Sequence, residues 1–275
     1  MTDIPSRATS VPARLGVAAR FADGELTLDL TPQPETLHHG IVRASVLSFA
    51  IDAVSGVTLD GGGDMWTFTT DMSVRTRPMP APRRVTAVNK ILRRGRRSAT
   101  CLVEVTTDEG VPIATGAVGF AHVPRKPTDP PKPAIPPEHA PRFLRVVQGL
   151  TRPLRDEAAI EVIDAAAGVL EMAVTPEVCN PAGTLQGAMV ALLAEAAAED
   201  LLAMRFGSPV IVVDLDLRYL AQSGDGPVRT RSRLLGTGPD APVQVELVDT
   251  ATDRVTTHVY ARAVAVPDAG AGAGA

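Results

Sequence analysis

Aromatic residues and cysteines are scarce in this chain. Only 3% of its 275 residues are Phe, Trp or Tyr, and the formal net charge at neutral pH is -4. So few aromatic rings cannot form a surface on which bases stack, and a negative net charge does not attract the phosphate backbone of a nucleic acid. Nucleic acid is therefore excluded as the main partner. Cys101 and Cys179 are the only cysteines, which excludes a disulfide framework.

Long apolar runs are also missing. No stretch approaches the roughly 18 apolar residues that a membrane-spanning helix needs. The first five residues, MTDIP, lack the basic start and apolar run of a signal peptide. We therefore expect a cytoplasmic protein without a membrane span. Zinc-ligand spacings and nucleotide-binding glycine loops are absent too, and the run Gly61–Gly63 precedes a strand instead of a helix.

What the chain does contain is a repeat. Residues 24–32 read GELTLDLTP, and residues 168–176 read GVLEMAVTP. In both halves a short loop follows, and then a glycine that we expect to open a helix. The predicted helices, 40–55 and 187–204, are apolar on nearly all sides, which is typical of a buried helix. Two diverged copies of one unit predict a pseudo-dimer within a single chain.

The remaining elements of each unit are predicted as four strands after the helix. One antiparallel sheet wrapped around each long helix is the simplest way to bury that helix, so the fold class is α+β. Short leading helices are expected at 11–20 and 142–155. Eight of the eighteen residues in 124–141 are proline, which favours an extended linker. The predicted domains are residues 1–123 and 142–266, joined by the linker 124–141 and followed by a disordered tail, 267–275.

The second half carries a motif. Residues 180–188 read NPAGTLQGA, with Glu195 nine positions after Gln186. This pattern resembles the hotdog-fold acyl-CoA thioesterases of the PaaI-like type, whose signature is Asn-x-x-Gly-x-x-His-Gly-Gly followed by Asp or Glu nine positions after the His. The run 212–220, VVDLDLRYL, is also similar to the next strand of that family. The resemblance covers both halves and implies a tandem, or double, hotdog.

Each half departs from the family pattern in a different way. Gln186 stands in the second half where the family has its His, whereas the first half keeps His39-Gly40. Ser48 occupies the position of the family carboxylate in the first half. Asp52 follows one helical turn later and therefore lies on the same helix face.

The resemblance implies two unequal sites, because the family builds each site from two protomers. Site A joins the first-half loop to the second helix, and site B does the reverse. Site A comprises His39, Gly40, Glu195 and Glu199; site B comprises Asn180, Gln186, Gly187, Ser48 and Asp52.

Thioester hydrolysis needs a donor for the developing oxyanion and a carboxylate that activates water or attacks directly. Backbone N–H groups of Gly40 and Gly187, at the expected helix starts, would be suitable donors. Glu195 is predicted as base or nucleophile, with His39 orienting the carbonyl or the water and Asp52 as a further catalytic candidate. Structural roles remain open for each residue, and His38 could face inward in place of His39.

A basic segment is the last predicted feature. Residues 90–97 contain five cations, whereas the equivalent segment 234–239 has none. The resemblance implies one coenzyme A phosphate site here, although a solvated hairpin tip is an equal alternative. The five cations are Lys90, Arg93, Arg94, Arg96 and Arg97.

The leading interpretation is an acyl-CoA thioesterase that hydrolyses a fatty or aromatic acyl-CoA to free acid and coenzyme A. It needs no cofactor other than the coenzyme A of its substrate. The alternative is a non-catalytic acyl-CoA binding or regulatory hotdog protein, since each site lacks one family group. Pairing of two chains into a homodimer is possible in either case.

Overall fold

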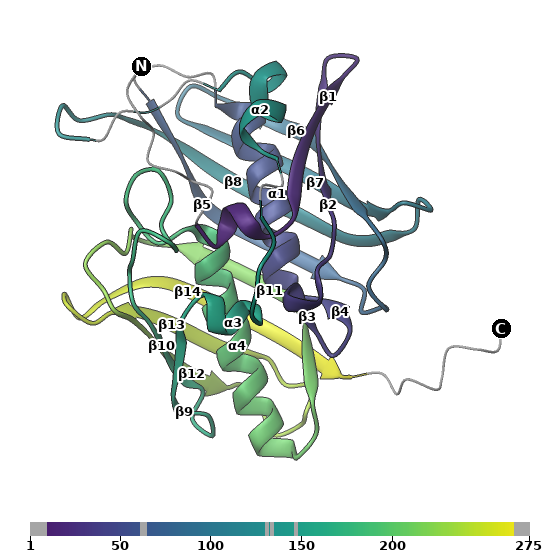
Figure 1. The fold of residues 1–275 in the computed structure, drawn as a ribbon. Helices are drawn as coiled ribbons and strands as arrows, with labels where there is room; N and C mark the ends of the chain where they lie inside the picture. The colour runs from purple at the N-terminus through teal and green to yellow at the C-terminus, as the bar shows by residue number, and fades with distance from the viewer. Residues whose placement is uncertain (1–9, 61–64, 130–131, 133–134, 146–147, 267–275) are drawn as a thin grey trace.

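A computed structural model describes residues 10–60, 65–129, 132, 135–145 and 148–266. Twelve antiparallel strands form one continuous sheet in the order β1-β2-β6-β7-β8-β5-β11-β14-β13-β12-β10-β9 (Figure 1). The first-half strands are β1 Val17–Ala22, β2 Glu25–Leu30, β5 Met65–Thr76, β6 Val85–Arg94, β7 Ser98–Thr107 and β8 Pro112–Pro124. The second-half strands are β9 Ile160–Asp164, β10 Val169–Met172, β11 Val210–Tyr219, β12 Val228–Leu234, β13 Val243–Asp249 and β14 Arg254–Ala265.

Two long helices, α1 (Ala44–Leu59) and α4 (Gly187–Phe206), pack against this sheet and against each other (Figure 1). α1 contacts mainly strands of the first half, together with β11 at the junction, and α4 contacts strands of the second. The two halves join where β5 pairs with β11, from Asp71↔Arg218 to Arg75↔Asp214. Each half therefore contributes one helix and six strands to a single layered structure.

Small residues let the sheet approach the helices closely. Almost every residue of α4 from Ala188 to Leu202 is buried, and many of them are alanine. On β8, a Cβ added to Gly116 would lie 2.8 Å from the side chain of Ile51 on α1. Only glycine permits this approach, so the tight packing of α1 against its sheet depends on Gly116.

The leading elements of each half differ from the prediction. The predicted helices 11–20 and 142–155 are wrong. The first segment forms η2 (Pro12–Arg14) and the start of β1. The described residues of the second belong only to the one-turn helices α2 (Ala140–Phe143) and α3 (Leu154–Glu157) and the chain between them, with β9 following at 160–164. Asp23 and Gly24 both adopt positive φ, 53° and 80°, which closes β1 and β2 into a hairpin.

The start of the first long helix also differs. α1 begins at Ala44 instead of residue 40, after two-residue strands β3 (Leu37–His38) and β4 (Ile41–Val42) that follow η3 (Pro34–Thr36). The second helix begins at Gly187, as predicted. Within the proline-rich segment, η4 (Pro137–His139) precedes α2. The glycine run at 61–63 and the tail at 267–275 lie outside the described residues. Of the helices in the described part of the chain, none has the length and apolar character to cross a membrane.

Candidate active site

Asp52 on α1 faces the beginning of α4. Its Oδ2 lies 3.8 Å from the position that a Cβ on Gly187 would occupy. Thr69 of β5 donates its hydroxyl to Asp52 Oδ1 at 2.5 Å, which holds the carboxyl group in place. Site B therefore brings a first-half carboxylate to the first residue of a second-half helix.

Burial raises the pKa of Asp52 to about 6, and the hydrogen bond from Thr69 opposes this rise only in part. A carboxyl group with a pKa near 6 is ionised at neutral pH and is a stronger base than an ordinary aspartate. Such a pKa suits general-base catalysis, which is most efficient when the pKa of the base lies near the working pH.

The start of α4 is capped by Gln186. The side-chain oxygen of Gln186 accepts a hydrogen bond from Ala188 N at 2.6 Å. The first N–H groups of a helix have no acceptor within the helix. Because Ala188 N–H is used by the cap, Gly187 N–H is the group at this helix start suited to stabilising a negative oxygen.

Tyr219, at the end of β11, lies beside Gly187 and Asp52. Its hydroxyl donates to the carbonyl of Gly187 at 3.1 Å. Burial raises the pKa of Tyr219 well above its ordinary value, and the nearby Asp52 charge adds to the rise. Tyr219 therefore stays protonated and fixes the first turn of α4 beside Asp52.

A cavity of about 190 Å³ extends from Asp52 along α1. Its walls come from α1, β5, β8 and the proline-rich segment. The lining residues are Asp52, Ala53, Gly56, Val57, Asp60, Thr67, Thr69, Phe120 and Ile135. The Asp52 carboxylate, whose pKa is raised, thus lies at the wall of a partly apolar cavity that is large enough for a small organic group.

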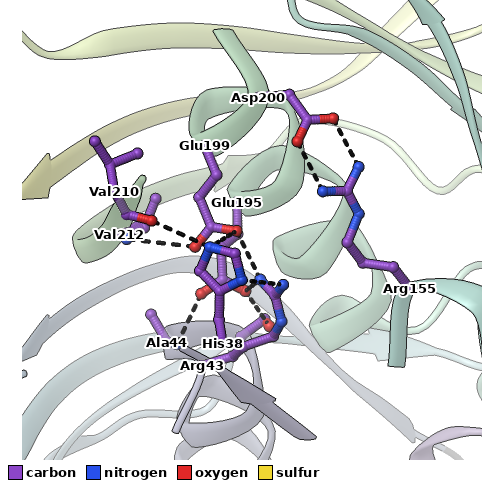
Figure 2. Close-up of polar contacts among 10 residues, drawn as sticks. His38, Arg43, Ala44, Arg155, Glu195, Glu199, Asp200, Val210 and Val212 are labelled. Carbon is purple, nitrogen blue, oxygen red and sulfur yellow. Dashed lines mark hydrogen bonds and ion pairs between the residues drawn. The ribbon is translucent and has the colours of Figure 1, made fainter. Parts of the chain in front are cut away.

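Site A has a different character. Glu195 is completely buried and accepts hydrogen bonds from Ala44 N at 2.8 Å and from the Ser45 hydroxyl (Figure 2). Burial, together with the neighbouring charge of Glu199, raises the pKa of Glu195 well above its usual range, although Arg43 opposes this. The acceptor positions of Glu195 are therefore occupied by the chain itself.

Arg43 connects the two site A carboxylates. Its Nη1 lies 2.7 Å from Glu199 Oε2 and 3.6 Å from Glu195 Oε2 (Figure 2). All three side chains are at most 5% exposed. A buried guanidinium between two carboxylates compensates charge that the interior could not otherwise hold. Site A is thus filled by an internal ion cluster of Arg43, Glu195 and Glu199.

His38, and not His39, faces this cluster. Arg43 Nη2 donates to His38 Nδ1 at 3.1 Å, and His38 Nε2 lies 3.1 Å from the carbonyl of Val210 (Figure 2). This pattern requires the proton on Nε2 and a neutral ring. Burial lowers the pKa of His38, which agrees with the neutral form.

His39 and Gly40 occupy an exposed turn between β3 and β4, with φ of 49° and 76°. The expectation that Gly40 opens the helix is wrong, because two consecutive positive φ values make a tight hairpin turn here. The backbone N–H that reaches the site A carboxylate belongs to Ala44. The corresponding motif positions, His39-Gly40 and Gln186-Gly187, therefore have different structures in the two halves.

Two other predicted residues bond to their own local backbone. Asn180 Oδ1 accepts from Ala182 N and Thr184 N, at 2.9 and 3.2 Å, and so shapes the loop before α4. Ser48 is buried and donates to the carbonyl of Ala44 at 2.8 Å. These contacts explain both residues structurally.

The five basic residues surround the exposed turn between β6 and β7. Arg94 donates to the carbonyl of Leu59 at 3.4 Å, so it partly satisfies the C-terminal end of α1. Lys90, Arg93, Arg96 and Arg97 are exposed at the surface. In the described part of the chain, no cluster of His, Cys, Asp and Glu could hold a metal ion.

Thr69, Tyr219 and Arg43 were not predicted as parts of a site, whereas the inward position of His38 was the alternative considered for His39. For Tyr219 a signal existed, because it alternates with the apolar residues Leu215 and Leu217 along one strand. Arg43 carries no comparable signal, since its carboxylate partners are more than 150 residues away.

No protein-family profile matches the sequence, and no curated protein matches it. Solved structures do match. A tesB protein of Mycobacterium avium subs. paratuberculosis is 14% identical, covers 94% of this chain and 98% of its own, and has a TM-score of 0.63. An acyl-ACP thioesterase from Bacteroides thetaiotaomicron is 12% identical, with coverages of 86% and 97% and a TM-score of 0.58. A 12:0-ACP thioesterase from Umbellularia californica is 9% identical, with coverages of 87% and 96% and a TM-score of 0.57. At these identities the likeness shows the fold, which is one that thioesterases have.

Proposed function

We propose that this protein is a thioester hydrolase with a double hotdog architecture of the PaaI-like type, and that it acts on acyl-CoA at site B. The observation that carries this proposal is the placement of Asp52 beside Gly187, at the wall of the cavity. A base of raised pKa, a helix N-terminus and an adjoining apolar space are what hydrolysis of an acyl thioester requires.

In this mechanism Asp52 removes a proton from a water molecule as that water attacks the thioester carbonyl carbon. Gly187 N–H stabilises the oxyanion, supported by the dipole of α4. When the oxyanion collapses, the carbon–sulfur bond breaks and the thiol leaves with the proton held by Asp52. Thr69 positions the carboxylate. The side-chain amide NH₂ of Gln186 is a second donor toward the carbonyl, since its oxygen caps the helix.

Site A is inactive in this proposal. Glu195 is enclosed by Arg43, Ser45 and Ala44, so neither water nor a thioester carbonyl has an approach to it. The base predicted from the family pattern thus has a stabilising role, and the catalytic carboxylate is Asp52, one turn along the other helix. The two halves act as the two protomers of a dimer in which only one site has kept its chemistry.

Coenzyme A fits the exposed cations of the β6–β7 turn. Lys90, Arg93, Arg96 and Arg97 would bind its phosphates, whereas Arg94 serves the end of α1. Two structural neighbours are acyl-ACP thioesterases by name, so the acyl carrier is a question for experiment. Hydrolysis of the same acyl group from coenzyme A and from a carrier protein, compared directly, distinguishes the two thiols.

The test is thiol release from acyl-CoA by wild-type protein, by Asp52→Asn and by Glu195→Gln. We expect Asp52→Asn to lose about 10²–10⁴-fold in kcat and Glu195→Gln to retain most of it. The reverse result would place the reaction at site A. Tight acyl-CoA binding without thiol release in the wild type would establish the alternative function, a non-catalytic acyl-CoA binding protein.

A further inference from the structure

The cavity beside Asp52 has two chemically distinct regions. Between Asp52 and Asp60 its lining includes the small or apolar residues Gly56, Val57, Phe120 and Ile135. Phe120 is 2% exposed, and Ile135 packs against the core. An apolar group that leaves the carbonyl next to Asp52 would therefore contact these apolar side chains in a partly apolar space.

The far end of the cavity is polar. Asp60, at the end of α1, lines the cavity there, and Lys132 Nζ lies 2.5 Å from Asp60 Oδ1. Lys132 also donates to the carbonyl of Met65 at 2.5 Å, and its side chain is only 6% exposed. An alkyl chain that reached this ion pair would have to desolvate it, which is unfavourable.

These dimensions limit the length of the chain that fits. From Asp52 to Asp60, α1 rises by about 12 Å. The cavity volume is about 190 Å³. An apolar cavity of about 150 Å³ holds one benzene molecule, so this volume is room for about six carbon atoms.

We infer that this cavity is an acyl-binding pocket for chains of about six carbons, with Gly56 and Ile135 as residues that determine chain length. Ile135 lies in the proline-rich segment, so this segment contributes a wall of the pocket in addition to connecting the two halves. The inference rests on the proposed function, because it takes Asp52 as the point where the thioester sits.

Two substitutions change the pocket in opposite directions. Gly56→Leu would extend a side chain into the cavity, since a Cβ at residue 56 has only Phe120 Cε1 near it, at an ordinary 3.8 Å. Leucine is also a better helix former than glycine, so the fold should be kept. Ile135→Ala would enlarge the pocket without touching α1.

The experiment measures kcat/KM for CoA thioesters from acetyl to palmitoyl, with calorimetric binding of the free acids as a second readout. We expect the wild type to prefer hexanoyl over palmitoyl by at least tenfold. Gly56→Leu should lose hexanoyl turnover by tenfold or more and keep acetyl turnover, and Ile135→Ala should shift the optimum to longer chains. Melting temperatures check that both variants fold.

An unchanged length profile in both variants, with hydrolysis still dependent on Asp52, would overturn this inference and leave the proposed function standing. Absence of hydrolysis for every thioester would overturn the proposed function instead. In that case calorimetry still tests the acyl-binding pocket. Binding of hexanoate by the wild type that is lost in Gly56→Leu would support the pocket. Equal binding of hexanoate by the two proteins would contradict it.

Discussion

Arg43 Nη1 lies 2.7 Å from Glu199 Oε2, and this contact links the start of α1 to the middle of α4. The pair joins the two halves of the chain inside the core, where both side chains are at most 5% exposed. The same guanidinium also serves Glu195, which is completely buried. Site A is thereby an internal ion cluster that holds the two halves together.

Removal of this cation should be costly. We expect Arg43→Met to lower the free energy of unfolding by about 3–5 kcal/mol, because two buried carboxylates lose their counterion. Chemical denaturation measures the change. A matched control is Arg155→Met, since Arg155 pairs with Asp200 at 2.7 Å nearer the surface (Figure 2). The control should lose about 1 kcal/mol or less.

Neutralising Glu195 and Glu199 tests whether uncompensated charge causes the loss of stability in Arg43→Met. Addition of Glu195→Gln and Glu199→Gln to Arg43→Met should restore most of the lost stability, because no uncompensated charge then remains buried. If the triple variant is as unstable as Arg43→Met alone, packing and not charge explains the effect of Arg43.

The pH dependence of turnover should follow the ionisation of Asp52. The pKa of Asp52 is raised to about 6, so the carboxylate form that acts as base is present above that pH and lost below it. We expect kcat/KM to rise with pH and to level off above an apparent pKa of about 6. A profile with no inflection between pH 5 and about 7 would contradict the role of Asp52 as the base.

The same pKa predicts an effect on stability with a definite sign. Because burial raises the folded-state pKa of Asp52 from 3.8 to about 6, the folded protein holds this proton more tightly than the unfolded chain. The contribution of protonated Asp52 to the free energy of unfolding is therefore fully present below about pH 4, and it is lost as the pH rises through 6.

Asp52→Asn removes that titration. We expect this variant to be more stable than the wild type at pH 8, by on the order of 1 kcal/mol, and to have no such advantage at pH 4. Thermal melts at the two pH values measure the difference. Equal advantages at both values would show that the carboxyl group is not desolvated as described.

The two motif glycines should respond differently to alanine. Gly40 has φ of 76° with open space around it, so Gly40→Ala should cost about 1 kcal/mol of stability and leave turnover unchanged. A Cβ at Gly187 would lie 3.3 Å from the Tyr219 hydroxyl and 3.8 Å from Asp52 Oδ2. Gly187→Ala should therefore keep stability and lower kcat/KM, as steady-state kinetics would show. Equal losses of turnover in both variants would contradict the assignment of site B.

The exposed cations can be tested by charge reversal. If these arginines bind the coenzyme A phosphates, as proposed, Arg93→Glu and Arg96→Glu should raise KM for acyl-CoA severalfold and leave kcat unchanged, because they do not touch the reacting group. Added salt should weaken this difference. The control is a thioester of a short thiol without phosphates, for which the variants and the wild type should agree.

The sequence alone determined the repeat, the two buried helices and the polar residues on their faces. These features follow from local periodicity, because a helix that is apolar all round must be buried. A motif glycine marks the start of the helix only in the second half, at Gly187. Gly187 and Asp52 could be named as candidates because one belongs to the family motif and the other lies one helical turn after the position of the family carboxylate. The leading strands β1 and β9 could not be predicted, because their sequences lack a clear alternation.

Only the tertiary structure decided which site is open. Arg43 reaches Glu195 and Glu199 from a distance of more than 150 residues in the chain, and no local pattern encodes that contact. Thr69 was equally hidden, since the register of β5 against β8 shifts between Thr69 and Asp71 and breaks the alternation that would have placed its side chain. Long-range packing places both Arg43 and Thr69. It buries Glu195 beside a compensating cation and leaves Asp52 at the wall of the cavity. Asp52 is therefore the accessible carboxylate, and Glu195 is not.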